Sequence, residues 1–343
     1  MLIAFMGFTE GIAMDEELTE LLTRLTRVGA VADGDVMLLR DAVWSDDHIA
    51  APVVDALFAV NDQLTGYSPV WTDFFIEAIE YYLVDQTPPH GFVDDAAATW
   101  LHTRIEKNGR ISSLTELELL VAVIERAETV PDDLKHYALS QIENVIISGE
   151  GPTRRDGVIR PNCVDAIEVE LLRRLVFAGG GEGAVIVGSG EADMLFRIKN
   201  RALSGDNATN WMRLFVQAVG NHLTAHSDYR PLSAEEAQHF NALMVENTPN
   251  LGSFFRHMLP ADKIGAGTIA QAFKALFPKA EDRFAKRLAL DNSHLLTTEE
   301  AGWLKSQIAA DEHIDDYEKA LLTFVLDEAE NAPSMLETLR RQA

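Results

Sequence analysis

The stretch WTDFFIEAIEYYL, residues 71–83, returns later in the chain as WMRLFVQAVGNHL, residues 211–223. Neither copy contains proline, and apolar residues recur every three or four positions, the period that turns one face of a helix toward a core. The matching apolar pairs are Phe74 with Leu214, Phe75 with Phe215, Ile76 with Val216, Ala78 with Ala218, Ile79 with Val219 and Leu83 with Leu223. We therefore predict a helix at each place.

Other segments repeat in the same order. The pairs are VMLLR at 36–40 with VELLR at 169–173, DALFAVND at 55–62 with DMLFRIKN at 193–200, and VDDAAATWLHTRI at 93–105 with LTTEEAGWLKSQI at 296–308. A third version of the last pair, at 232–244, has His239 where the others have Trp100 and Trp303. Repeated supersecondary units bury their apolar faces against neighbouring units. We expect Trp71, Trp211, Trp100 and Trp303 to anchor the cores of two tandem helical bundles.

The predicted fold class is all-α, two tandem homologous helical bundles with no significant β-sheet. Residues 149–157, GEGPTRRDG, are polar and rich in glycine and proline, which is typical of a linker. We predict a flexible tail at 1–14, a first bundle at 15–148, and a second bundle at 158–343 with extra helices at about 261–290.

The composition limits the classes of function. The net charge of −25 disfavours nucleic acid and anionic membranes, whose binding depends on Lys and Arg. The single cysteine, Cys163, excludes an internal disulfide and suits a reducing cytoplasm, where we expect an inert, half-buried thiol. The sequence contains no run of about 18 apolar residues, so we expect no segment to insert into a membrane. The first 14 residues lack the basic region of a secretory signal. Met14 immediately precedes the acidic start of an expected helix, and we expect it to be either the initiator or the end of a flexible tail.

Short polar turns between the expected helices carry a family resemblance. The turns are KNGRI at 107–111, DGVI at 156–159 and DEHI at 311–314, each near an acidic residue: Glu116, Glu168 and Glu318. This pattern resembles the TerB-like helical family, named for tellurite-resistance proteins and including the N-terminal part of some DnaJ-type co-chaperones. The resemblance covers most of residues 20–343 as two copies. It implies an all-helical module of stress-response or membrane-associated systems without a settled enzymatic activity.

One pair of histidines has the spacing of a helical metal site. His222 and His226 are four residues apart, which places both imidazoles on one side of a helix, and Asp228 is a candidate third ligand. The positions of the first copy that match the two histidines are Tyr82 and Gln86. A metal site would therefore belong to one half of the chain, and the alternative is a pair of surface or helix-end histidines.

Three further constellations lack parts that their chemistry needs. The loop around residues 108–111 has the glycine of a calcium-binding loop but not its carboxylates. The glycine-rich segment 179–190 has no Gly-Lys-Ser/Thr to hold a phosphate, which favours an interhelical loop. The E-x-x-H pattern of Glu236 and His239 occurs once, whereas a di-iron bundle needs it twice. We therefore predict no cofactor.

The sequence favours a non-enzymatic interaction or scaffold module. We expect a cytoplasmic protein with an unidentified protein partner, without nucleic-acid binding and without insertion into a membrane. The alternative is a metal-binding or metal-dependent protein that uses His222, His226 and Asp228. A hydrolase is a third class, for which the chain shows no nucleophile motif.

Overall fold

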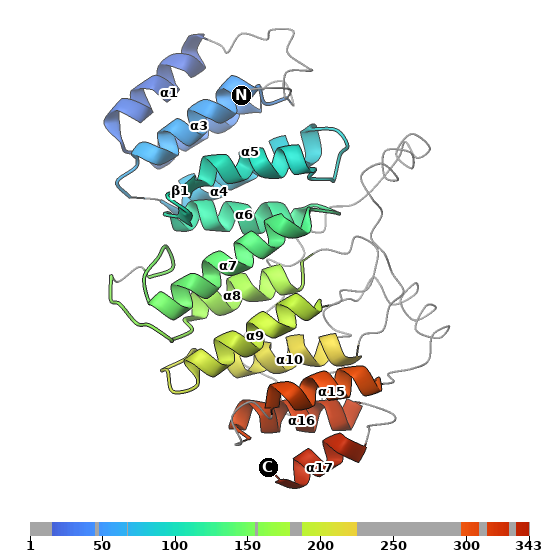
Figure 1. The fold of residues 1–343 in the computed structure, drawn as a ribbon. Helices are drawn as coiled ribbons and strands as arrows, with labels where there is room; N and C mark the ends of the chain where they lie inside the picture. Colours follow the sequence, from blue (N-terminus) through green and yellow to red (C-terminus); the bar gives the residue numbers. More distant parts are fainter. Residues whose placement is uncertain are drawn as a thin grey trace. The chain divides into compact units, whose positions relative to one another are not determined.

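The described part of the chain folds into helices, most of them joined by short turns (Figure 1). The computed structural model describes residues 16–44, 48–66, 68–154, 157–178, 187–224, 296–308, 314–328 and 334–342. Within these ranges the only strands form one hairpin, β1 (Glu106–Lys107) with β2 (Arg110–Ile111). The all-α prediction is therefore confirmed. The tail expected at 1–14 and the extra helices expected at about 261–290 lie outside the described residues.

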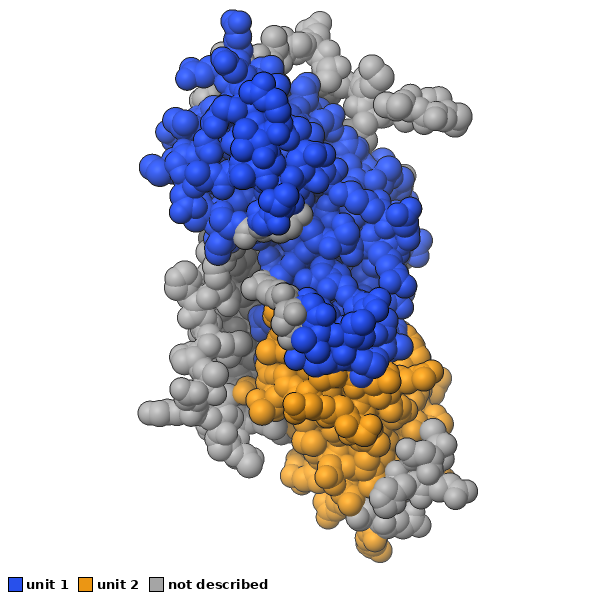
Figure 2. Space-filling view, turned by 90° about the vertical axis from the view of Figure 1, so that its left-hand side faces the viewer, with its two compact units in different colours: residues 1–161, 170–181, 232–244 blue, residues 162–169, 182–231, 245–343 orange. Residues whose placement is uncertain are grey.

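The chain divides into two compact units (Figure 2). Unit 1 consists of residues 1–161, 170–181 and 232–244, and unit 2 consists of residues 162–169, 182–231 and 245–343. The boundary falls within helix α8 (Ala166–Val176).

Unit 1 contains most of the described helices of the first half. They are α1 (Glu16–Val28), α2 (Asp33–Val43), α3 (Ala51–Gln63), α4 (Pro69–Glu80), the π-helix η1 (Tyr81–Gln86), α5 (Asp95–Ile105), α6 (Leu114–Arg126) and α7 (Asp132–Ser148). Helix α1 packs on α3, and α4 packs on both α2 and α6. The sequence did not predict the π-helix, which continues α4 with a wider turn.

Unit 2 is built around α10 (Trp211–Thr224), which packs on α16 (Asp316–Glu328) and α9 (Ser189–Ala202). Helix α17 (Ser334–Gln342) contacts both α15 (Thr298–Ile308) and α16. The segment TTEE at 297–300 has the sequence pattern of a capping box and forms one at the start of α15: the Thr297 amide donates to Glu300, and the Glu300 amide donates to the Thr297 hydroxyl. The similar pattern at Ser233 and Glu236 lies outside the described residues.

The repeated tryptophans lie in comparable aromatic clusters. Trp71 and Trp211 are fully buried, as predicted, whereas Trp100 and Trp303 are half-buried. In unit 1 the Phe58 ring makes edge contacts with Phe75 and Trp100, at centroid distances of 5.1 and 5.9 Å. In unit 2 Phe196 makes edge contacts with Phe215 and Trp303, at 5.1 and 5.5 Å. These residues occupy positions that correspond in the repeated segments.

Glycine closes the last helix of the first half. Gly149 ends α7 in the left-handed conformation, with φ 76°, and its amide donates to the carbonyl of Val145. A Cβ added there would lie 2.3 Å from the nitrogen of Pro161 and 2.5 Å from the carbonyl carbon of Arg160. The close approach of the chain after this helix therefore needs glycine at position 149.

Candidate functional site

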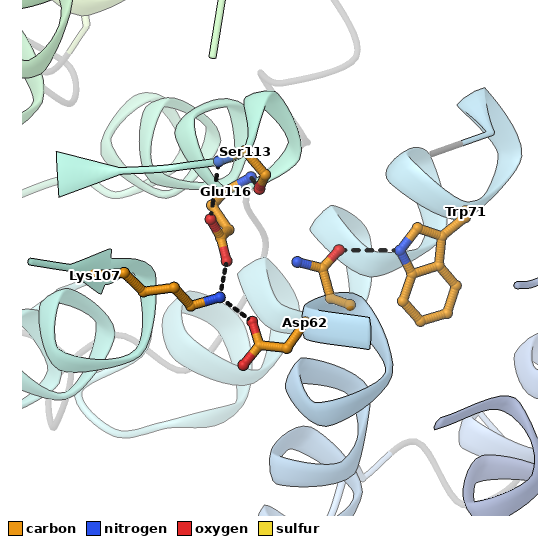
Figure 3. Close-up of polar contacts among 6 residues, drawn as sticks. Asp62, Trp71, Lys107, Ser113 and Glu116 are labelled. Carbon is orange, nitrogen blue, oxygen red and sulfur yellow. Dashed lines mark hydrogen bonds and ion pairs between the residues drawn. The ribbon is translucent and has the colours of Figure 1, made fainter. Parts of the chain in front are cut away.

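The first charged cluster lies beside the hairpin of unit 1 (Figure 3). Asn108 and Gly109 turn the hairpin with φ of 57° and 78°, and this turn places Lys107 between helices α3 and α6. The ammonium of Lys107 pairs with Asp62 and lies 3.5 Å from Oε1 of Glu116. Burial lowers the pKa of Lys107, but the hydrogen bond with Asp62 and the charge of Glu116 outweigh it and raise the pKa above its ordinary value.

Glu116 in this cluster serves the backbone of α6 as well as the lysine. Its side chain is 1% exposed, and Oε2 accepts a 3.2 Å hydrogen bond from the amide of Ser113. The Ser113 hydroxyl accepts from the Glu116 amide at 3.1 Å, which completes a capping box. Glu116 therefore stabilises the start of α6 while its second oxygen faces Lys107.

This arrangement explains why the loop is a poor calcium site. The hairpin presents the ammonium of Lys107 to the two carboxylates, so a tethered cation already offsets part of their charge and occupies the space between them. Arg104, at the first ligand position of a calcium loop laid over this turn, pairs with Asp55 and lies 3.9 Å from the centre of the Trp100 ring.

The second cluster lies in unit 2 and buries a lysine completely. Lys199 of α9 is 0% exposed, and its ammonium lies 2.5 Å from Oδ2 of Asp315 and 2.6 Å from Oε1 of Glu318. Asp315 and Glu318 cap the start of α16: Oδ1 of Asp315 accepts from the Glu318 amide at 3.0 Å, and Oε2 of Glu318 accepts from the Asp315 amide at 3.1 Å. Burial raises the pKa of Glu318, and Lys199 opposes that rise. The repeat aligns Lys199 with Asn61 and not with Lys107. The lysine that pairs with the capping carboxylate therefore comes from strand β1 in unit 1 and from helix α9 in unit 2.

The third cluster lies where α4 becomes the π-helix. Arg126 donates two 2.9 Å hydrogen bonds to Asp85 of η1, and its Nε lies 3.4 Å from Oε1 of Glu80. Arg174 donates to Glu125 at 2.9 and 2.6 Å. Burial is the main cause that raises the pKa of Glu80 to about 7, with Arg126 opposing and the negative charge of Asp85 adding to the rise.

Sequence reasoning missed the Glu80 cluster. One signal was present, because the repeat aligns Glu80 with Gly220, so only one half carries a carboxylate at this place. The partners of Glu80 on α6 come from a segment that the repeat does not align. A pKa near neutrality beside a π-helix is a feature that functional sites share with structural ion networks.

The candidate metal residues are only partly within the described structure. Nδ1 of His222 lies 2.8 Å from the carbonyl oxygen of Val187, and the imidazole makes an edge contact with Trp303 at 5.0 Å. His226 and Asp228 lie outside the described residues, so the predicted ligand set stays a prediction. Across the ranges that the structure describes, no group of three or more His, Cys, Asp or Glu is placed to hold a metal ion.

Of the other sequence candidates, the structure describes Cys163. Cys163 is 6% exposed, and its Sγ lies 2.9 Å from the carbonyl oxygen of Asp206. This is a structural environment for a thiol, more buried than the half-exposed one that we expected. Residues 179–186 of the glycine-rich segment, Glu236 and His239 lie outside the described residues.

The fold and its clusters define an all-α protein in which buried carboxylates stabilise helix starts and pair with lysine or arginine. No match to this chain is found among protein-family models, curated proteins or solved structures. No helix in the described part of the chain is long and apolar enough to cross a membrane.

Proposed function

We propose that this chain is a non-enzymatic helical interaction module that binds another protein. The observation that carries the proposal is on α2, where the neighbouring residues Met37 and Leu38 are 69% and 58% exposed. Large exposed apolar side chains that lie together are typical of protein-binding surfaces. Neither side chain contributes to the core that Val36 and Leu39 of the same helix enter.

The charged clusters support a structural role for the buried polar groups. The carboxylates of Glu116 and Glu318 each cap a helix and pair with a lysine. A catalytic carboxylate needs access to a reacting group as well as a suitable pKa. Glu116 and Glu318 each stabilise a helix start and an ion pair, so we assign them a structural role and not a catalytic one. This assignment leaves the exposed surface as the part of the molecule that we propose to be functional.

The TerB-like resemblance adds a role in stress response to the proposal, by analogy alone. The corresponding ring contacts of Phe58 and Phe196 support an origin of the two units by duplication of one bundle. The net charge of −25 favours a cytosolic partner protein over nucleic acid.

Affinity capture tests the interaction proposal. The full chain, immobilised through a terminal tag, is incubated with a native extract, and each retained protein is purified and titrated against the free chain. We expect at least one saturable protein partner. Retention of small molecules or metal in place of any protein would overturn the proposal.

A second candidate function, metal binding, is favoured by the orientation of His222. Because the carbonyl of Val187 can only accept, Nδ1 of His222 is the nitrogen that donates to it, which leaves Nε2 as the nitrogen that would bind a metal. Metal-bound histidines share this arrangement, in which the other ring nitrogen donates to a carbonyl. His226 and Asp228 would complete the ligand set. Metal analysis of purified protein tests this function: a stoichiometric ion that is lost in His222→Ala would establish it in place of the interaction module.

A further inference from the structure

One face of α2 combines exposed apolar residues with exposed acidic ones. We call Asp33, Met37, Leu38 and Asp41 the α2 face; all four are exposed. Asp33 lies one helical turn before Met37, and Asp41 lies one turn after it, so the two carboxylates are about 12 Å apart along the helix axis. The opposite side of α2 carries the buried residues Val36, Leu39 and Val43. The α2 face therefore points away from the core of unit 1.

The acidic residues of the α2 face are available to a partner. Among the residues that the structure describes, neither Asp33 nor Asp41 has an ion-pair partner. Two arginines of this region are engaged elsewhere, since Arg24 pairs with Asp35 at 2.6 Å and Arg40 pairs with Glu77 at 2.6 Å. Helix α1, which packs on α2, has exposed acidic residues in its first turn and one exposed arginine, Arg27, in its last. The two carboxylates of the face are therefore open to the cations of a partner.

We propose that the α2 face binds an amphipathic helix of a partner protein whose apolar residues are bracketed by lysine or arginine. This inference rests on the proposed function and names its surface and partner chemistry. Apolar side chains of the partner would cover Met37 and Leu38, and its cations would meet Asp33 and Asp41. Helices that bind this way place apolar anchors one turn apart and gain specificity from the charges beside them.

Charge argues against the other occupants of this surface. In a second copy of the chain, the same face would bring Asp33 and Asp41 toward like charges. The N-terminal residues 1–15, MLIAFMGFTEGIAMD, contain two acidic residues and no lysine or arginine, so they supply no pair of cationic side chains to bracket the apolar residues of the face. An anionic membrane or nucleic acid would be repelled.

A labelled synthetic peptide tests the proposal with the full-length chain. The peptide is a helix with paired leucines bracketed by lysines about two turns apart, and its dissociation constant is measured by fluorescence anisotropy at fixed salt. Met37→Ser with Leu38→Ser removes the apolar part of the face at constant charge. The matched control, Val158→Ser with Ile159→Ser, removes another exposed apolar pair, whose side chains are 51% and 60% exposed.

The charge of the face is tested separately. Asp33→Asn with Asp41→Asn is compared with Asp132→Asn with Asp133→Asn, a pair of exposed aspartates in the first turn of α7 that changes the net charge equally. We expect about tenfold weaker binding for the apolar variant and about threefold for the acidic variant. Each control should change the affinity by less than about twofold.

Several outcomes would overturn the proposal. Equal weakening in the variants and their controls would show that the peptide senses only overall charge or apolarity, and no weakening would show that it binds elsewhere. Self-association that Leu38→Ser abolishes in sedimentation would assign the face to a second copy. An increase of about tenfold in peptide affinity on removal of residues 1–13 would assign it to the chain's own N-terminus. A protein partner captured equally by wild type and by the Met37→Ser/Leu38→Ser variant would contradict the assignment of the α2 face as the binding surface. It would still support the proposal that the chain is an interaction module.

Discussion

The indole Nε1 of Trp71 donates a 3.1 Å hydrogen bond to Oδ1 of Asn61, and both side chains are fully buried. Figure 3 shows this contact between α3 and α4. In unit 2 the aligned residues are Trp211 and Lys199. Lys199 turns to Asp315 and Glu318, and Nε1 of Trp211 has no hydrogen-bond partner within the described structure. Both tryptophans are therefore buried, but only the indole N–H of Trp71 has a hydrogen-bond acceptor within the described structure.

Trp71→Phe should destabilise the protein more than Trp211→Phe does. Both changes remove similar apolar contacts, but only the first breaks a hydrogen bond and leaves Asn61 without its partner, an added cost of about 1–3 kcal/mol. Urea unfolding, with hydrogen exchange assigned to each unit, measures the difference. Asn61→Leu added to Trp71→Phe should recover part of it. Equal losses for the two single variants would contradict the role of Asn61.

Lys199→Met should destabilise unit 2 by about 3–5 kcal/mol, because it leaves two buried carboxylates without their cation. The matched change Lys107→Met should cost about 1 kcal/mol, because Lys107 and Asp62 are partly exposed to solvent, where such pairs contribute little, and the buried Glu116 keeps its hydrogen bond from the Ser113 amide. Lowering the pH should reduce the Lys199→Met loss as Glu318, whose pKa burial raises, becomes protonated. A loss for Lys199→Met no larger than that for Lys107→Met, measured by urea unfolding, would refute the structural role of the buried lysine.

Glu80→Gln should flatten one part of the stability–pH curve. The pKa of Glu80 is about 7 in the folded chain and 4.5 ordinarily, so the folded state binds the proton more tightly. The free energy of unfolding should therefore fall as the pH rises between those values, by about 2–3 kcal/mol. Glu80→Gln should remove the fall and be more stable than wild type at about pH 8.

The control for this titration is Glu77→Gln on the same helix. Glu77 pairs with Arg40 at the surface, with 51% of its side chain exposed, so its replacement should leave the pH dependence unchanged. Urea midpoints at about pH 5 and 8 suffice for the comparison. The assignment to Glu80 fails if the curve of Glu80→Gln follows that of wild type.

Gly220→Ala should destabilise unit 2 although alanine favours helices. A Cβ at position 220 would lie 2.2 Å from Cε1 of Phe324, so α10 and α16 would have to separate or the ring would have to turn. Overpacking of this kind costs about 1–3 kcal/mol, against a gain of about 1 kcal/mol in helix propensity. Adding Phe324→Leu should relieve the clash. Thermal unfolding of the single and double variants tests this, and a stabilised single variant would contradict it.

Local sequence patterns predicted the helices because apolar period and caps act within a few residues. The burial of Trp71 and Trp211 and the capping box at Thr297 and Glu300 followed from such patterns. The pairing of Lys199 with Glu318 did not, because it depends on how α9 and α16 are packed and joins residues far apart in the chain. Glu80 was missed for the same reason, since its pKa is set by burial and by Arg126 on another helix.

The α2 face is a further property that periodicity alone did not reveal. Met37 and Leu38 belong to an apolar segment, VMLLR, that the repeat presented as core-forming. In the structure Val36 and Leu39 enter the core, while Met37 and Leu38 point outward. Exposure of apolar residues became visible only once the neighbours of the helix were placed.

The most direct test of the account is affinity capture with three immobilised full-length chains side by side: wild type, Met37→Ser/Leu38→Ser, and the control Val158→Ser/Ile159→Ser. We predict that one protein is retained by the wild-type chain and by the control variant but not by the Met37→Ser/Leu38→Ser variant. In titration, this protein should bind the wild-type chain and the control variant with similar affinity, and the Met37→Ser/Leu38→Ser variant more weakly. No protein retained by the wild-type chain, together with one metal ion per chain that disappears in His222→Ala, would contradict the interaction module.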